Sequence, residues 1–190
     1  MTENELAGPS IAILVANGFN ENQVTAVQRA LTNASVKFKI VAPEQGLVNG
    51  WQDNAWGHYF TVDEMISTAM GSDYDFLFLI GGERGVAKLK TNPHTRRIVN
   101  HFLEAEKPVA AIEAGVELLA LSPKSASLTV SAPEACGQAL VSAQIELVAE
   151  DVSFDRHVLT SAGGDITAWV EKAVEMLSTC IVNDEQAQAA

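Results

Sequence analysis

The sequence contains few cysteines, few basic residues and no long uninterrupted run of apolar residues. Two of its 190 residues are cysteine, Cys136 and Cys180, which excludes a disulfide framework and favours a reducing, cytoplasmic location. The 12 Lys and Arg residues face 24 Asp and Glu residues, so the formal net charge is −12. A polyanion would be repelled, and we therefore expect no nucleic-acid partner. No apolar run is long enough to span a bilayer, so we expect no membrane partner either.

The rest of the composition is typical of a globular protein. Hydrophobic residues make up 47% of the chain and charged residues 19%, and this length suits one domain with a sizeable core. We expect a flexible N-terminus over residues 1–9, a single domain over 10–181 and a polar C-terminal tail over 182–190. The first ten residues lack the basic and apolar regions of a secretory signal, so we expect none.

Short apolar segments with β-branched residues recur along the chain and predict buried strands. The clearest is "DFLFLIGG", which ends on a glycine pair. The turn-rich stretch "GLVNGWQDNAWGHYF" is expected to hold one or two further short strands. The main predicted strands cover residues 11–16, 37–43, 75–82, 108–112, 127–133 and 157–163.

Helical patterns lie between these strands. Apolar residues recur at helical spacing after the first strand, as in Val24, Val27 and Leu31. Asn92 is a suitable N-cap for a helix over residues 93–106, and Asp165 is a suitable N-cap for the last helix. The sequence also predicts a short helix over residues 61–70 and a helix that begins directly after Glu113.

The alternation of strands and helices predicts an α/β protein. We expect a three-layer α/β/α sandwich around a mostly parallel, flavodoxin-like sheet. Ligands in such folds bind beyond the carboxyl ends of the strands. Three of these ends attract attention: "ANGFNENQ", "GGERG" and "EAG". The last places a carboxylate, Glu113, at a strand-to-helix junction, where α/β enzymes often place a nucleophile.

These three ends, in this order, resemble the PfpI/ThiJ superfamily of the class I glutamine amidotransferase-like fold, which includes the Parkinson-associated deglycase. The segments "YDFLFLIGGERG", "KPVAAIEAG" and "VLTSAGGDITAWV" are similar to the family's conserved blocks. The likeness extends from Ile11 to about Leu177. A further resemblance, around "KPVAAIEAGVELL", is to the C-terminal domains of large-subunit catalases, which are regarded as non-catalytic.

The resemblance implies that the family's usual nucleophile is missing. The family carries a reactive cysteine at the elbow between strand and helix, and that position falls on Glu113. Ala114 follows where the family often has histidine, and Gln23 takes the place of the first-loop glutamate that supports the cysteine. Gly82 and Ala114 match the positions whose amides form an oxyanion-hole-like site. The arginine of the family's "TSrG" segment falls on Ala162.

Glu113 and Gln23 each allow two interpretations. Glu113 is either an acidic residue favoured at a helix start by the helix dipole, or a carboxylate that shapes a ligand site or acts in acid–base catalysis. Gln23 belongs either to a capping box that begins at Asn20, or to a pair in which its amide donates a hydrogen bond to Glu113. In the second case the two residues imitate the oxidised state of the family cysteine.

Other polar residues near the predicted site also have alternatives. Arg84, next to Gly81 and Gly82, would either pair with Glu113, bind an anionic ligand or remain a solvated surface charge. Glu117 lies one turn after Glu113, but no histidine is near in sequence, so we expect no metal and no cofactor.

Cys136 and two tryptophans complete the candidates. Cys136 is expected to be a buried structural thiol rather than a displaced nucleophile. Trp51 and Trp56 are expected either to cover the pocket, to form an interface or to pack in the core.

Two functions from different classes remain open. The first is a non-catalytic domain that binds or senses a small molecule, or serves as a dimeric structural module. Its ligand-binding residues would be Gln23, Gly81, Gly82, Arg84, Glu113 and Ala114. The second is a divergent hydrolase, lyase or hydratase that acts on a small carbonyl or nitrile-like compound, with Glu113 as general acid–base. The missing cysteine favours the first. The resemblance also implies a homodimer.

Overall fold

A computed structural model describes residues 8–188, and the exposure of side chains up to residue 179. Its centre is a seven-stranded sheet in the order β11-β12-β8-β7-β1-β3-β6. All neighbouring pairs are parallel except β11 and β12. The seven strands are β1 (Ile11–Leu14), β3 (Phe38–Ala42), β6 (Glu64–Met65), β7 (Phe76–Leu79), β8 (Val109–Ile112), β11 (Val152–Asp155) and β12 (Val158–Ser161).

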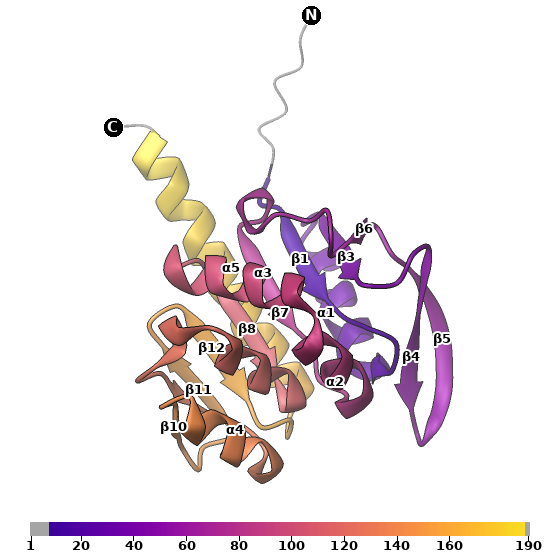
Figure 1. Ribbon diagram of the computed structural model, residues 1–190. Helices are drawn as coiled ribbons and strands as arrows, with labels where there is room; N and C mark the ends of the chain where they lie inside the picture. The colour runs from indigo at the N-terminus through magenta and orange to yellow at the C-terminus, as the bar shows by residue number, and fades with distance from the viewer. Residues whose placement is uncertain (1–7, 189–190) are drawn as a thin grey trace, which may run out of the picture.

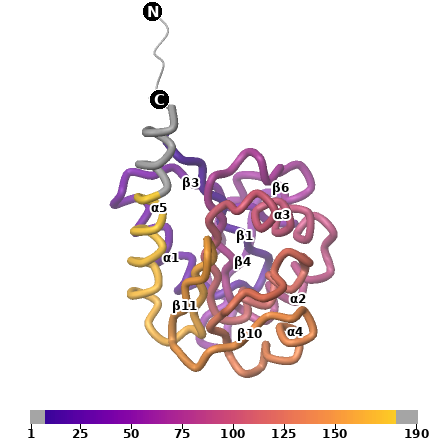
Figure 2. Tube along the Cα trace, turned by 90° about the vertical axis from the view of Figure 1, so that its left-hand side faces the viewer, coloured from indigo at the N-terminus to yellow at the C-terminus, as the bar shows by residue number. Residues whose placement is uncertain are grey.

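Helices cover both faces of this sheet (Figures 1 and 2). One face carries α1 and α5, which contact each other. The other carries α2, α3 and a 3₁₀ helix over Glu113–Leu121, which also contact one another. The α-helices are α1 (Glu21–Asn33), α2 (Glu83–Thr91), α3 (Pro93–Glu104), α4 (Gly137–Ser142) and α5 (Ile166–Gln188). The predicted three-layer α/β/α sandwich with a mostly parallel sheet is confirmed.

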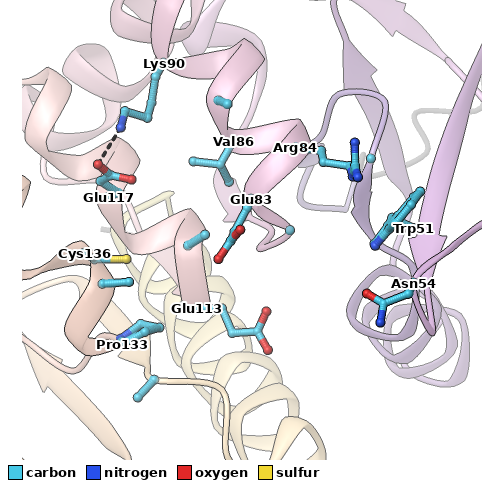
Figure 3. Close-up of a pocket in the computed structure, with 16 residues that line it drawn as sticks. Trp51, Asn54, Glu83, Arg84, Val86, Lys90, Glu113, Glu117, Pro133 and Cys136 are labelled. Atoms are coloured by element: carbon cyan, nitrogen blue, oxygen red, sulfur yellow. Dashed lines mark hydrogen bonds and ion pairs between the residues drawn. The ribbon is translucent and has the colours of Figure 1, made fainter.

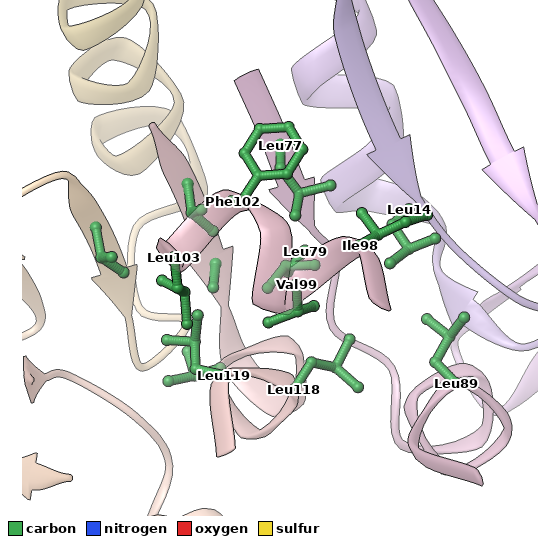
Figure 4. Packing of buried hydrophobic residues seen from close by; sticks show 14 of the residues in the cluster. Leu14, Leu77, Leu79, Leu89, Ile98, Val99, Phe102, Leu103, Leu118 and Leu119 are labelled. Atoms are coloured by element: carbon green, nitrogen blue, oxygen red, sulfur yellow. The ribbon is translucent and has the colours of Figure 1, made fainter. Parts of the chain in front are cut away.

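The apolar strands lack a polar side because both of their faces are buried. In β1, Ile11 and Ile13 enter a cluster with α1 and α5, while Ala12 and Leu14 enter the opposite cluster. Figure 4 shows part of this second cluster, where α3 and the 3₁₀ helix pack on the sheet. Successive side chains of a strand point to opposite faces, so a strand between two helical layers needs apolar residues at every position.

Two small sheets lie outside the main one. The first contains β2 (Phe19–Asn20), β4 (Leu47–Gln52) and β5 (Ala55–Thr61). Its antiparallel β4–β5 hairpin turns at Asp53 and Asn54, whose φ angles of 50° and 59° are those of a tight two-residue hairpin turn. The second pairs β9 (Thr129–Val130) with β10 (Glu146–Leu147).

The structure corrects several predicted elements. Residues 61–70 do not form a helix, because Glu64 and Met65 pair with the edge of β3. Within 127–133, only Thr129–Val130 is a strand, and it lies outside the main sheet. Helix α2, helix α4 and strand β11 were not predicted as separate elements.

The two ends of the chain are described only in part. Helix α5 continues to Gln188, across most of the predicted polar tail, and Asp165 Oδ1 accepts a hydrogen bond from the amide of Ala168, as expected for its N-cap. Most of the predicted flexible N-terminus, residues 1–7, lies outside the described residues, as do residues 189–190.

Candidate functional site

A cavity of about 640 Å³ lies at the carboxyl ends of the central strands (Figure 3). Its wall combines the start of α2, the start of the 3₁₀ helix, the loop before α4 and the β4–β5 hairpin. Among the predicted site residues, Gly82, Arg84, Glu113 and Ala114 line it. The three strand ends singled out in the sequence therefore meet at one site.

Glu113 occupies a strained junction between β8 and the 3₁₀ helix. Its φ angle is 50°, in the left-handed region that residues with a Cβ rarely adopt. Two residues later, a Cβ on Gly115 would approach the carbonyl oxygen of Leu79 to 2.5 Å, so the turn packs directly against β7. A retained strained turn of this kind is a feature of functional sites, and it confirms the predicted sharp elbow.

The side chain of Glu113 has a defined place. Its Oε2 accepts a hydrogen bond from Asn20 Nδ2 at 3.2 Å. A Cβ on Gly81 would approach Glu113 Cβ and Oε2 to 2.8 Å, and one on Gly163 would approach Glu113 Cγ to 2.4 Å. Two glycines therefore make room for the carboxylate, and an amide from the first loop holds it.

The predicted hydrogen bond between Gln23 and Glu113 is wrong. Gln23 is fully buried, and its Oε1 accepts a hydrogen bond from the Gly81 amide at 2.8 Å. Its Nε2 has no hydrogen-bond partner among the described residues. The capping-box interpretation is half right, because Asn20 Oδ1 accepts from the Gln23 amide at 3.3 Å while the Gln23 side chain does not return to Asn20.

Asn20 is thus the residue that sequence reasoning missed. Its oxygen caps α1 while its Nδ2 contacts Glu113. The available signal was its position: an asparagine at an N-cap uses one side-chain atom for the helix and keeps two N–H donors free for another partner.

Gly82 and Ala114 lie where the resemblance placed the two backbone amides. Gly82 is the N-cap of α2 with a φ angle of 100°, and a Cβ there would approach the Asn20 amide nitrogen to 2.6 Å. Ala114 is the second residue of the 3₁₀ helix. The first amides of a helix have no intrahelical acceptor, so this rim of the pocket favours acceptor groups.

Arg84 turns away from Glu113 and lies over an aromatic ring. Its guanidinium carbon is 4.1 Å from the centroid of the Trp51 ring, a cation–π distance. Trp51 in turn meets Trp56 edge-to-face, with ring centroids 5.2 Å apart. Trp51 lines the pocket, which was one of the three alternatives for the two tryptophans. Trp56 does not line it and is 54% exposed.

Glu117, Lys90 and Cys136 form the opposite wall (Figure 3). Lys90 Nζ donates to Glu117 Oε1 at 2.5 Å. Cys136 is 4% exposed, as predicted for a structural thiol. Burial raises the pKa of this thiol, the negative charge of Glu117 raises it further, and Lys90 partly opposes the shift. The thiol therefore remains protonated near neutral pH. The side chain of Cys180 lies outside the described residues.

A hydrogen-bonded pair, the buried Glu21 and the exposed His58, ties the hairpin to the first helix. Glu21 is 5% exposed, and its Oε2 accepts from the His58 amide at 2.8 Å while its Oε1 lies 2.5 Å from His58 Nδ1. Cβ atoms on Gly50 or Gly57 would collide with this carboxylate. The pair holds the hairpin that carries Trp51 beside the pocket.

The described residues contain neither a metal-binding cluster nor a membrane-spanning helix. No three His, Cys, Asp or Glu side chains within residues 8–179, whose side chains the structure describes, come together as a metal-binding group. In the same part of the chain, no helix combines the length and apolar character needed to cross a membrane.

The chain is similar to proteins of known sequence and structure. It is 25% identical over 154 residues to Catalase-2 of Bacillus subtilis. The aligned segment covers 78% of this chain and 21% of the catalase. Among solved structures, a two-domain protein from Anabaena variabilis with DJ-1/ThiJ/PfpI-like and ferritin-like domains superposes with a TM-score of 0.82 at 20% identity, over 90% of this chain and 48% of that one.

A second solved structure matches along almost its whole length. DJ-1 of Schizosaccharomyces pombe superposes with a TM-score of 0.76 at 18% identity, over 90% of this chain and 96% of that one. At such identities the structures show the fold alone. In the comparison with curated sequences, the chain spans less than a quarter of the length of each of the two relatives that it matches.

A match along nearly the whole described domain identifies the family of this chain. The sequence profile of the DJ-1/PfpI family matches residues 9–176, which include the elbow, the glycine pair and the first loop. By this match the chain belongs to the DJ-1/PfpI family.

Proposed function

We propose that this protein is a non-catalytic DJ-1/PfpI domain that binds a small molecule at Glu113. One observation carries the proposal: Glu113 has a φ angle of 50° at the elbow, accepts a hydrogen bond from Asn20 and lines a cavity of about 640 Å³. An unused cavity would not require a strained backbone, two flanking glycines and a fixed carboxylate. A cavity of this size suits a small ligand.

The groups around Glu113 favour binding over catalysis. A carboxylate that acts as acid or base needs a partner that exchanges protons. The side chain that contacts Glu113 is the Asn20 amide, which donates a hydrogen bond but does not exchange a proton. The thiol that lines the pocket, Cys136, is held protonated by burial, and so is a poor nucleophile.

The alternative is a divergent hydrolase, lyase or hydratase. The amides of Gly82 and Ala114, at two helix starts, line the same pocket as Glu113. They would stabilise an oxyanion formed from a small carbonyl or nitrile-like substrate, with Glu113 as general acid–base. This alternative predicts turnover that depends on Glu113, which the binding proposal does not.

A thermal-shift screen tests the proposal. We expect at least one compound of a metabolite panel to raise the melting temperature of the wild type by a few degrees, and to leave Glu113→Gln unshifted, since ligand binding to the native state stabilises it. Glu146→Gln, an exposed change on β10, is the matched control and should respond as the wild type does.

Three outcomes decide between the functions. Equal shifts in the wild type and in Glu113→Gln would place the ligand elsewhere and contradict the proposal. Glyoxalase, deglycase or amidase turnover that Glu113→Gln abolishes would favour the enzymatic alternative. A panel that shifts neither protein would leave a structural module as the better description.

Assembly and location form the rest of the proposal. We propose a homodimer, supported by the exposed apolar side chains of the β4–β5 hairpin, where Tyr59 is 69% and Leu47 53% exposed. Large exposed apolar groups of this kind occur at protein interfaces. A cytoplasmic location stays a prediction from the low cysteine content.

A further inference from the structure

The charges that line the pocket divide into a neutralised pair and three free groups. Five charged side chains line it: Glu83, Arg84, Lys90, Glu113 and Glu117. Lys90 and Glu117 neutralise each other through their 2.5 Å contact. Within the described residues, Arg84, Glu83 and Glu113 belong to no ion pair. An occupant therefore meets one positive and two negative groups.

Arg84 forms the positive end of the pocket. The Trp51 ring, 4.1 Å from the guanidinium carbon, holds the guanidinium plane without neutralising its charge. A stacked guanidinium keeps its N–H groups for a carboxylate, which it binds through two parallel hydrogen bonds. Trp51 itself is fixed by its edge-to-face contact with Trp56.

Glu113 and Glu83 form the negative end. Figure 3 shows Arg84 beside Trp51 on one side of the pocket, and the two carboxylates away from it. Asn20 supplies Glu113 with one hydrogen bond, to Oε2. A carboxylate has room for about four hydrogen bonds, so Glu113 can accept several more from the N–H groups of an ammonium ion.

The rest of the pocket lining is made mainly of small apolar groups, with Val86 and Pro133 on the side of Glu113 away from Arg84 (Figure 3). Val86, Ala87, Ala114, Pro133, Ala135 and Ala162 line this part of the pocket. They offer no further charge and little hydrogen bonding from side chains. This wall fits a short aliphatic body and offers a charged one no partner.

We propose that the occupant is a small zwitterion, an aliphatic amino acid whose carboxylate binds Arg84 and whose ammonium group binds Glu113. This inference rests on the proposed binding function and specifies its ligand class. A simple anion would leave Glu113 without a counter-charge, and a simple amine would leave Arg84 without one. A molecule with both charges supplies Arg84 and Glu113 with one partner each, while Glu83 keeps its charge.

Isothermal titration with matched compounds tests the ligand class. The probes are alanine, valine, leucine, 4-aminobutanoate and 5-aminopentanoate, each compared with n-butylamine and butanoate, which carry one charge each. We expect at least one zwitterion to bind at least about 10-fold more tightly than both singly charged compounds, a difference of about 1.4 kcal/mol.

Variants assign the two ends. Glu113→Gln and Arg84→Gln should each weaken binding of that zwitterion by about 10-fold or more, and Arg84→Lys should restore part of the loss, since lysine keeps the charge but not the planar fork. Arg96→Gln, an exposed change on α3, should bind as the wild type does.

A wrong ligand class and a wrong binding function would give different results. No heat of binding for any zwitterion up to about 10 mM, or equal affinity for butanoate, overturns the ligand class. If the metabolite panel still yields a ligand that depends on Glu113, the proposed binding function stands and only its ligand changes. If the panel also yields none, the proposed function falls with it.

Discussion

At the scale of single residues, Glu113 combines an unfavourable backbone with a favourable environment. Its left-handed conformation costs about 1–2 kcal/mol for a residue with a Cβ. The helix start, the Asn20 amide and the space beside Gly81 and Gly163 favour a carboxylate at this position. These contacts offset part of the backbone cost at Glu113.

A comparison of two substitutions at this residue tests the backbone argument. Both Glu113→Ala and Glu113→Gly remove the carboxylate, but only glycine adopts a φ angle of 50° without strain. We expect Glu113→Gly to be more stable than Glu113→Ala by about 1 kcal/mol, measured by urea unfolding. Greater stability of the alanine variant would show that the turn relaxes and is not held by its surroundings.

The residue scale also shows the limit of motif matching. Gln23 was predicted to bind a ligand and to contact Glu113, yet it is fully buried, does not line the pocket and makes no hydrogen bond to Glu113. Its Oε1 accepts from the Gly81 amide, and no pattern in the sequence distinguishes that acceptor role from donation to Glu113. Asn20 makes the expected contact from three residues earlier.

At the scale of elements, the β11–β12 hairpin carries a titratable group in its turn. His157 lies between the two strands, and its carbonyl oxygen accepts from the Val109 amide at 3.0 Å. Its Nε2 is buried without a hydrogen-bond partner in the described part of the chain. Burial lowers the pKa of His157 below its ordinary value of 6.5; Arg156 lowers it too, whereas Glu106 and Asp155 oppose the shift.

This histidine predicts a loss of stability in mild acid. Below about pH 6.5 the unfolded chain binds a proton that the folded chain refuses, so the free energy of unfolding falls as the pH drops from 7 towards the lowered pKa. We expect His157→Gln to lose less stability than the wild type between about pH 7 and 5, measured by urea unfolding at each pH. His94→Gln serves as control, because the His94 side chain makes no hydrogen bond or ion pair within the described residues, and identical pH slopes for wild type and His157→Gln would contradict the assignment.

At the scale of the whole molecule, net charge opposes the proposed dimer. Each chain carries a formal charge of −12, so two copies repel each other at low ionic strength. The exposed apolar side chains of the β4–β5 hairpin act in the other direction.

Light scattering at several salt concentrations tests the assembly. We expect a mass near twice the 20.3 kDa of one chain, with the dimer fraction rising between about 20 and 200 mM NaCl as the repulsion is screened. A mass of one chain at every salt concentration, measured well above micromolar protein, would contradict the homodimer.

The sequence by itself determined the fold class and the location of the site. Local patterns predict the buried strands, the helices between them and the polar segments at the strand ends. A strand that is buried on both faces needs apolar residues at every position, and such a run can be recognised from the sequence. The sequence also places a carboxylate, Glu113, directly after the strand "VAAI", where the resemblance to the family predicts the nucleophile position.

Only the tertiary structure decided which groups meet Glu113 and Arg84. Residues 61–70 have helical character, yet they follow the edge of β3, since backbone pairing there outweighs local propensity. Likewise Asn20 and not Gln23 contacts Glu113, and Arg84 stacks on Trp51 from a distant hairpin. These contacts depend on side-chain rotamers and on how distant segments approach in space, which local sequence patterns do not encode.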